Sequence, residues 1–149
     1  VFVTASCALA AVTSSIHKPL GVFFYLGLLM WLGGFALEII ADRQKSFFRS
    51  QSGNEDRFID TGLWSWSRHP NYFGEIVLWI GVALMSYPVL QGWQLVTLIS
   101  PIYVIVLLTW ISGARILEAR ADKKWADDPE YQSYKDRTPL MILWPPRSS

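Results

Sequence analysis

The sequence predicts an all-α fold: a polytopic membrane helical bundle with about four membrane segments and helix extensions on the cytosolic side. Hydrophobic residues make up 52% of the 149-residue chain and charged residues only 17%. The charges are also segregated, because residues 20–36 and 76–114 contain no Asp, Glu, Lys or Arg. A helix needs roughly 20 mostly apolar residues to cross a bilayer, so these runs predict membrane spans.

We expect one membrane domain that covers residues 1–149. Its spans are expected at about 2–16, 20–41, 73–89 and 94–114, with a polar loop at 42–72 and a polar tail at 115–149. The first span is short, and the sequence begins with Val1 rather than with Met. We interpret it as part of a truncated span, and the chain as the C-terminal half of a longer protein. A secretory signal peptide is the alternative, although the segment lacks a basic leader and is followed by Lys18.

The uncharged run that begins at Ile76 is about twice as long as one span requires. Pro88, Gln91 and Gly92 interrupt it, and proline and glycine are typical of turns that end helices. Residues 73–114 are therefore expected to form a helical hairpin.

The positive charges predict the orientation of the chain. Five of the 13 Lys and Arg residues lie between positions 43 and 68, and seven lie between positions 115 and 147. Positively charged loops face the cytosol, so both polar regions are expected there in a multi-pass integral membrane protein, with the hairpin turn on the far side. Cys7 is the only cysteine, which excludes an intramolecular disulfide, and neither a metal-binding His or Cys cluster nor a nucleic-acid-binding basic tract is expected.

A stripe of charged residues follows the second expected span. Glu38, Asp42, Lys45 and Arg49 are spaced i, i+4, i+7 and i+11, which places them on one face of a helix that continues past the membrane boundary. A simple solvated face is one interpretation. Glu38 favours a functional one, because an ionisable group among apolar residues usually faces a protein interior.

The segment SRHPNYFGE, residues 67–75, predicts an anion site. Pro70 is typical of the first turn of a helix, whose free N–H groups and partial positive charge attract phosphates. Arg68 and His69 add donors at that point, while Asn71 and Glu75 share one helix face at i, i+4. By itself, His69 could equally be a capping or interfacial histidine.

A third polar cluster follows the last expected span. Arg115, Glu118 and Asp122 recur at i, i+3 and i+7, and Tyr131 and Tyr134 lie three residues apart further along. The three clusters are expected at the cytosolic ends of three helices, where a soluble cofactor could bind while a lipid enters from the bilayer. The sequence contains no Rossmann or P-loop glycine motif.

Near the end of the sequence lies LWPP, residues 143–146, in which Trp144 precedes two prolines. The segment is expected to return to the membrane interface, where aromatic rings are favoured, or to form a frayed tail.

At GLWSWSRHPNYFGE, residues 62–75, the chain resembles the C-terminal domain of the steroid 5-alpha-reductase superfamily, and most closely a little-characterised branch of it. ADRQKSFFR, residues 41–49, is similar to the AN.QK..FR segment of sterol C14 reductases. The resemblance covers residues 20–146.

The resemblance implies NADPH as the cofactor. It assigns binding to residues of all three clusters: Glu38, Asp42, Lys45, Arg49, Trp64, Arg68, His69, Asn71, Tyr72, Glu75, Arg115, Glu118, Asp122, Tyr131 and Tyr134. Lys45 and Arg49 would meet phosphates, and Asn71, Tyr72 and Glu75 would contact ribose or nicotinamide.

The implied reaction is hydride transfer to a C=C bond of a steroid or other lipid, with a proton supplied by a tyrosine or a carboxylic acid. The sequence assigns no catalytic residue, and Tyr72 and Glu38 are only candidates for the proton donor. Asp42 replaces the Asn of the related AN.QK segment, which changes the ribose or adenosine contact expected there.

Two other functions are compatible with parts of the sequence. Isoprenylcysteine carboxyl methyltransferases, which use S-adenosylmethionine, share an RHPxYxGE-like element, but here Glu118 is followed by Ala119 instead of a second Glu. A non-catalytic subunit of a larger membrane assembly is the third hypothesis.

Overall fold

The computed structural model describes residues 2–16, 18–111 and 113–145, and these residues form helices and turns without a strand. The α-helices are α1 (Phe2–Val12), α2 (Val22–Ser50), α3 (Pro70–Ser86), α4 (Ser100–Val106), α5 (Ala114–Lys124) and α6 (Pro129–Arg137). Shorter 3₁₀ segments are η1 (Gly62–Ser65), η2 (Tyr87–Val89) and η3 (Gly92–Ile99), and η4 (Leu107–Ile111) is a π-helix. The predicted all-α class is confirmed.

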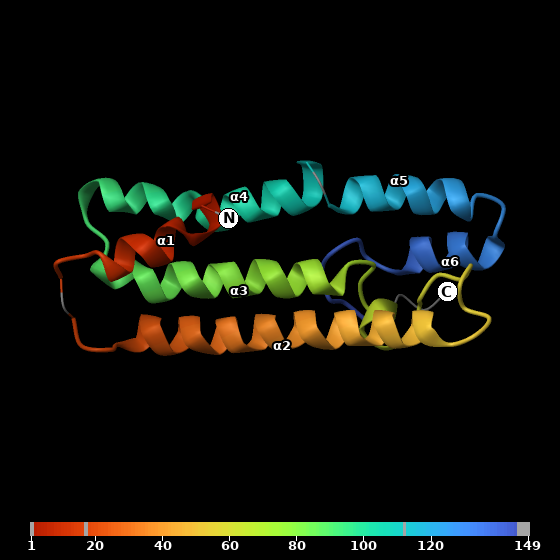
Figure 1. The fold of residues 1–149 in the computed structure, drawn as a ribbon, viewed down its shortest axis with the longest axis horizontal. Helices are drawn as coiled ribbons and strands as arrows, with labels where there is room; N and C mark the ends of the chain where they lie inside the picture. The colour runs from red at the N-terminus through yellow and green to blue at the C-terminus, as the bar shows by residue number, and fades with distance from the viewer. Residues whose placement is uncertain (1, 17, 112, 146–149) are drawn as a thin grey trace.

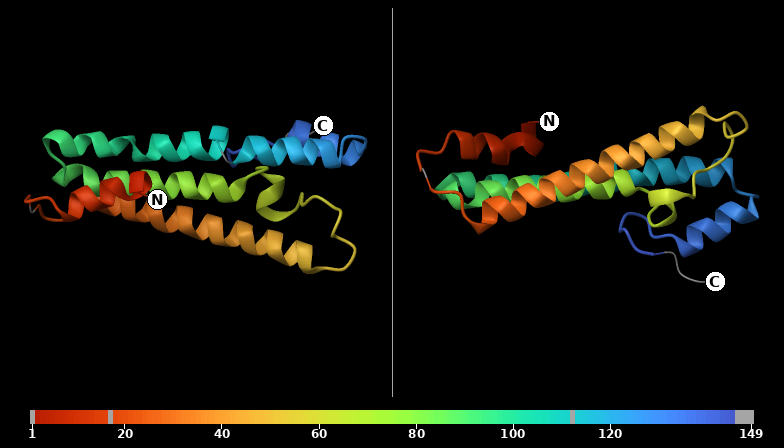
Figure 2. Two further views of the ribbon diagram at one scale, coloured as in Figure 1. Left: turned by 45° about the horizontal axis from the view of Figure 1, so that its top comes forward. Right: turned by 90° about the horizontal axis from the view of Figure 1, so that it is seen from below.

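The helices form an elongated bundle (Figure 1). Helices α2 and α3 run antiparallel along its length, α4 and α5 follow one another beside α3, and α6 folds back under α5. The end of α2, the start of α3 and both α5 and α6 therefore meet at one end, and the turn at 87–91 lies at the other. The right view of Figure 2 shows α5 between the diverging C-terminal half of α2 and α6.

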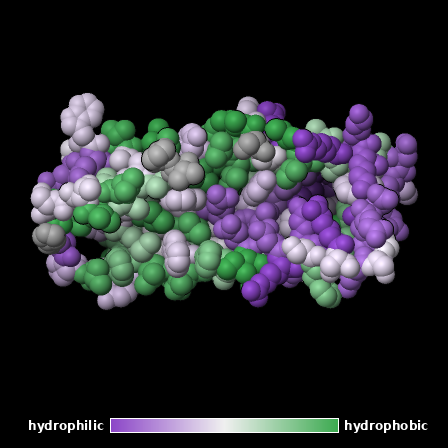
Figure 3. Space-filling view, viewed as in Figure 1, coloured by the Kyte–Doolittle hydropathy of each residue, from purple (hydrophilic) through white to green (hydrophobic). Residues whose placement is uncertain are grey.

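Three helical segments are long and apolar enough to cross a membrane: Val22–Ser50, Pro70–Val89 and Gly92–Lys124. They contain the spans expected at 20–41, 73–89 and 94–114, apart from the first two residues of 20–41, so the chain is a helical integral membrane protein. Its apolar and polar surfaces are separated along the bundle, with hydrophilic residues concentrated around α5 and α6 (Figure 3).

Two of the expected spans differ in form from a regular transmembrane helix. Helix α1 has 11 residues and is not among the three candidates, so a membrane crossing by residues 2–16 stays a prediction. The last span changes from 3₁₀ to α to π geometry before α5 begins, and Ser112 lies outside the described residues.

Glycines allow α2 and α3 to touch along their backbones. Gly27 on α2 faces Gly81 on α3, and Gly34 on α2 faces Gly74 on α3. The two glycines of each helix are seven residues apart, which places them on the same helix face. A Cβ atom at Gly34 would lie 2.5 Å from the carbonyl oxygen of Gly74, and one at Gly81 would lie 2.6 Å from that of Gly27. Small residues at such positions are a common basis of helix packing in membranes.

Gly34→Ala should therefore lower the free energy of unfolding by about 1–3 kcal/mol, since the new methyl group forces the two backbones apart. Gly33→Ala is the matched control, because nothing lies within 4 Å of a Cβ atom at Gly33. Unfolding in detergent micelles by titration with a denaturing detergent measures both values. Equal stability of the two variants would contradict the backbone contact.

Candidate functional site

Trp64 connects the end of α2 to helix α6. Its indole N–H donates to the carbonyl oxygen of Ala41 (3.0 Å), and its own carbonyl oxygen accepts from the Tyr134 hydroxyl (2.7 Å). Burial raises the pKa of Tyr134 well above its ordinary value, so this hydroxyl stays a donor at neutral pH. The short η1 turn is held in place because the amide of Leu63 donates to the side chain of Gln44 (2.9 Å).

The segment after α6 is attached to the approach of α3. The amide of Arg68 donates to the carbonyl oxygen of Pro139 (2.9 Å), and that of Trp144 donates to Trp66 (3.2 Å). Up to Trp144 this part of the chain is therefore attached to the bundle, which contradicts the frayed-tail hypothesis for Trp144. Pro146 lies outside the described residues, and a position at the membrane interface stays a prediction.

Glu118 on α5 binds two cationic or donor groups at the start of α3. One carboxylate oxygen pairs with the guanidinium of Arg68, and the other lies 3.0 Å from Nε2 of His69. The side chains are largely buried, with exposed fractions of 14% for Arg68, 17% for Glu118 and 7% for His69. The Nε atom of Arg68 is buried and finds no hydrogen-bond partner among the described residues.

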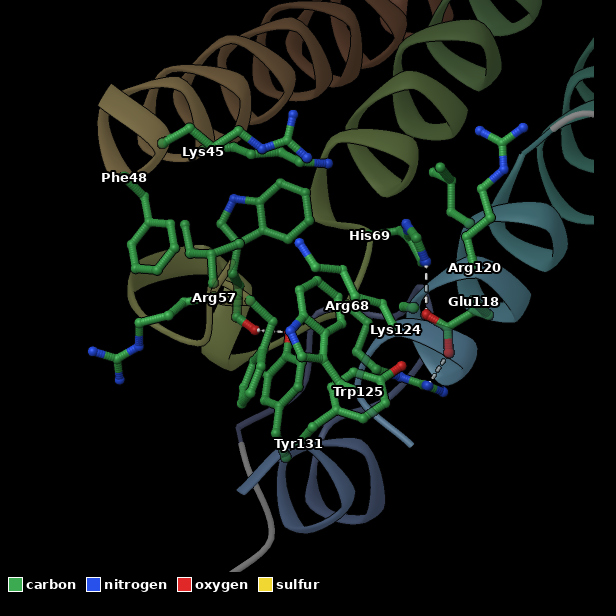
Figure 4. Close-up of a pocket in the computed structure, with 17 residues that line it drawn as sticks. Lys45, Phe48, Arg57, Arg68, His69, Glu118, Arg120, Lys124, Trp125 and Tyr131 are labelled. Atoms are coloured by element: carbon green, nitrogen blue, oxygen red, sulfur yellow. Dashed lines mark hydrogen bonds and ion pairs between the residues drawn. The ribbon is translucent and has the colours of Figure 1, made fainter. Parts of the chain in front are cut away.

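Arg68, His69 and Glu118 line a cavity of about 290 Å³ (Figure 4). The other lining residues come from α2, the 57–69 segment, α5 and α6. Its lining includes six cationic side chains: Lys45, Arg49, Arg57, Arg68, Arg120 and Lys124. Glu118 is the only acidic residue in the described lining. The cavity is therefore suited to a ligand with several negative charges. Its volume is at the lower end for small-molecule sites, so it would hold part of a large ligand.

Four aromatic side chains form one side of the cavity, which we call the aromatic wall: Phe58, Trp125, Tyr131 and Tyr134. The Phe58 ring centroid lies 5.3–5.7 Å from those of the other three, and Trp125 is tilted against Tyr131 at 5.5 Å. The indole N–H of Trp125 donates to the carbonyl oxygen of Asp56 (2.7 Å), which closes the 51–60 loop over α5.

A second polar cluster lies between α2 and α3, next to the cavity. We call it the acidic cluster, and it consists of Glu38, Asp42, Asn71 and Glu75. The side-chain amide of Asn71 donates to Asp42 (3.2 Å), and the Oδ1 atom of Asn71 is buried without a partner among the described residues. Glu38 and Glu75 are close enough to interact electrostatically with each other and with Asp42. Three carboxylates and an amide therefore occur together where apolar spans meet.

The rings of His69 and Tyr72 connect this acidic cluster to the cavity. They stack with centroids 5.3 Å apart and an interplanar angle of 11°. Because His69 lines the cavity and Tyr72 follows Asn71 on α3, this stacked pair lies between the cavity and the acidic cluster.

The structure brings eight of the fifteen predicted binding residues to the cavity: Lys45, Arg49, Trp64, Arg68, His69, Glu118, Tyr131 and Tyr134. Five others form the neighbouring cluster or its edge: Glu38, Asp42, Asn71, Tyr72 and Glu75. The remaining two lie elsewhere. Asp122 does not line the cavity but contacts a residue that does, because it accepts a hydrogen bond from the Tyr131 hydroxyl (3.0 Å). It also forms an ion pair with Lys135 (2.5 Å). Arg115 lies over the Trp110 ring, 4.5 Å from its centroid.

Sequence reasoning missed nine of the lining residues, and five of them bring charge or a large aromatic ring to the part of the cavity formed by α5 and the 51–60 loop: Arg57, Phe58, Arg120, Lys124 and Trp125. Arg120 and Lys124 are four residues apart and share a helix face with Leu117, which also lines the cavity, so their helical spacing was a usable signal. Phe58, Arg57 and Trp125 lie in loops or at a helix end, where no periodicity reports on orientation.

These features define a class: a helical membrane protein with a cationic, aromatic-walled cavity at its polar end. The family described as "Protein of unknown function (DUF1295)" matches residues 1–138, and the chain belongs to this family.

Two relatives extend the comparison. "3-oxo-5-alpha-steroid 4-dehydrogenase 1" of Bos taurus is 34% identical over 70 residues, which cover 47% of this chain and 27% of the relative. "Uncharacterized protein C594.04c" of Schizosaccharomyces pombe is 23% identical over 157 residues, which cover 91% of this chain and 43% of the relative. The chain thus spans less than half the length of either. No solved structure matches it.

The match to a steroid dehydrogenase supports the resemblance to the steroid 5-alpha-reductase superfamily at a coarse level. The narrower branch stays a prediction.

Glu118→Gln should lower the free energy of unfolding by about 2–4 kcal/mol, because it leaves the largely buried guanidinium of Arg68 without a counter-charge. Glu55→Gln, an exposed position in the 51–60 loop, is the control. The same micelle unfolding measurement compares the two variants, and combining Glu118→Gln with Arg68→Met should recover part of the loss. If Glu118→Gln lowers the free energy of unfolding no more than Glu55→Gln does, the ion pair between Glu118 and Arg68 does not contribute to stability.

Proposed function

We propose that this chain is the cofactor-binding half of a membrane-embedded, NADPH-dependent reductase that acts on a C=C bond of a steroid or another lipid. The observation that carries the proposal is the charge of the cavity, six cations against one carboxylate. NADPH bears a pyrophosphate and a 2′-phosphate, so it offers the clustered negative charge that such a cavity favours.

The residues present fit this cofactor. Lys45, Arg49 and Arg57 reach the cavity from one side, and Arg120 and Lys124 reach it from α5. A phosphate could therefore be bound by cations from separate elements, which would close the site around the ligand. Arg68 adds a further positive charge to the lining.

The acidic cluster suits the other end of the cofactor. When bound, NADPH would supply a hydride. Asn71 and Glu75 would hold ribose hydroxyls or the nicotinamide amide through hydrogen bonds, and Asp42 would orient Asn71. Tyr72 and Glu38 are the proposed candidates for the proton donor, since both lie where the polar cluster adjoins the apolar spans.

The substrate and the orientation in the membrane belong to the same proposal. A lipid or steroid would enter from the bilayer, consistent with the activity in the printed name of the Bos taurus relative. The polar end would face the cytosol, where NADPH is present, because Lys and Arg concentrate there.

The charge of the cavity also weighs against the other two hypotheses. S-adenosylmethionine carries a positive sulfonium and no phosphate, so six cations do not favour it. A purely structural subunit needs no cluster of like charges around a cavity, since their mutual repulsion destabilises the fold.

NADPH should raise the thermal unfolding temperature of the protein in detergent, whereas S-adenosylmethionine should not. Arg49→Ala should weaken NADPH binding roughly tenfold or more, since each charge-assisted contact contributes about 1.5–3 kcal/mol. Arg43→Ala is the matched control, because Arg43 is an exposed cation of the same helix that does not line the cavity. Stabilisation by S-adenosylmethionine alone would overturn the proposal, and no response to any cofactor would favour the structural subunit.

Asn71→Ala should lower both NADPH affinity and reductase turnover, because it removes the amide that Asp42 orients toward the ligand. Steady-state rates with a steroid substrate and calorimetric affinities would measure the two effects. If the variant keeps wild-type affinity and turnover, Asn71 has no part in cofactor binding.

A further inference from the structure

The cavity has a property that charge alone does not require, namely an aromatic wall beside its cations. We propose that this wall binds the adenine ring of the cofactor, so that the adenosine bisphosphate half of NADPH occupies the cavity. This inference rests on the proposed function and deepens it, because it assigns one half of the ligand to one set of residues.

The first support is the combination of lining chemistries. A nucleotide joins a flat π system to phosphates, and protein sites for it combine aromatic faces with cations. Here Phe58 and Trp125 are half-buried and line the same cavity as Arg57, Arg120 and Lys124. The cavity volume of about 290 Å³ suits such a fragment better than a whole dinucleotide.

The second support is the position of a lysine on Trp125. The ammonium of Lys124 lies 5.0 Å from the centroid of the Trp125 ring, so a cation covers a ring face that another planar group could take. Lys124 also pairs with Asp56 at 2.9 Å, but their side chains are 45% and 93% exposed, so the pair is weak. Lys124 can therefore leave the ring for a phosphate while the base takes its place.

Trp64 offers a comparison within the same cavity. Lys45 lies over its ring at 4.7 Å, but Trp64 is only 3% exposed and is fixed by its bond to Ala41. A base could not reach that ring without disrupting the end of α2. The accessible stacking position is therefore Trp125 (Figure 4). The ring of Phe58 lies beside it, with the two ring centroids 5.7 Å apart.

The test measures binding of ligand fragments to the full chain in detergent micelles by calorimetry. The probes are NADPH, 2′,5′-ADP, 3′,5′-ADP and inorganic phosphate. The variants are Trp125→Leu, which removes the aromatic face, and Trp125→Phe, which keeps a ring but also loses the bond to Asp56. Trp93→Leu is the control, because Trp93 is 90% exposed and η3 lies at the opposite end of the bundle.

We expect 2′,5′-ADP to bind the wild type, to compete with NADPH and to bind more tightly than phosphate. Trp125→Leu should weaken 2′,5′-ADP and NADPH by a similar factor of about ten or more, whereas Trp125→Phe and Trp93→Leu should stay within about threefold of wild type. Thermal unfolding of each variant without ligand shows whether it is folded, and the competition experiment needs no variant.

Two results would overturn the inference while the proposed function stands. One is tight NADPH binding that 2′,5′-ADP does not compete with, and the other is wild-type NADPH affinity in a folded Trp125→Leu variant. Tighter binding of 3′,5′-ADP than of 2′,5′-ADP would assign the aromatic wall to a different adenine nucleotide. That result would overturn both the inference and the proposed function. Absence of NADPH binding to the wild type would reject the proposed function itself.

Discussion

The direct backbone contact between α2 and α3 is the constraint on which the rest of the site depends. Gly34 and Gly74 leave no room for a side chain between the helices, and a Cβ atom at Gly74 would also meet the backbone of Glu38. This contact fixes the axial register of α2 against α3. About two turns beyond Gly34 along α2, Asp42 is then close to Asn71, whose side-chain amide donates a hydrogen bond to it. A wider helix pair held by large side chains would separate these groups.

The described lining of the cavity carries more positive charge than its one carboxylate neutralises. Glu118 pairs with Arg68, and the ammonium groups of Lys45 and Lys124 lie over tryptophan rings. Arg120 lines the cavity and is exposed to water. Water screens part of the resulting repulsion, so the fold tolerates it without a ligand. A polyanion would relieve it, which connects the electrostatics of the bundle to the proposed function.

Hydropathy and helix-end signals predicted the fold well. The uncharged runs predicted three spans that the structure contains, and Pro70 begins α3 as its position after SRH predicted. These signals are local, because a span needs only length and apolarity and a helix start needs only its own first turn. These local signals did not predict the irregular helical geometry of the last span. Its change from 3₁₀ through α to π geometry depends on packing against neighbouring helices.

The candidate site was only partly predictable. Residues such as Lys45, Arg68 and Glu118 belong to recognisable stripes or motifs, and the structure brings them to one cavity. Phe58 and Trp125 were missed, because a loop residue and a helix-end residue carry no periodic pattern that reveals which way they point. The side of the cavity that they form exists only when α6 folds back under α5.

By itself, the sequence determined that this chain is a helical membrane protein whose charged residues follow its spans, since hydropathy and charge act on each segment separately. The tertiary structure decided which charges meet. It separated Arg115 from the cavity, joined Arg68 to Glu118 across 50 residues of chain, and set an aromatic wall against the cations. The physical reason is that pairing and cavity formation depend on helix register and chain return, which are set by packing between segments distant in sequence.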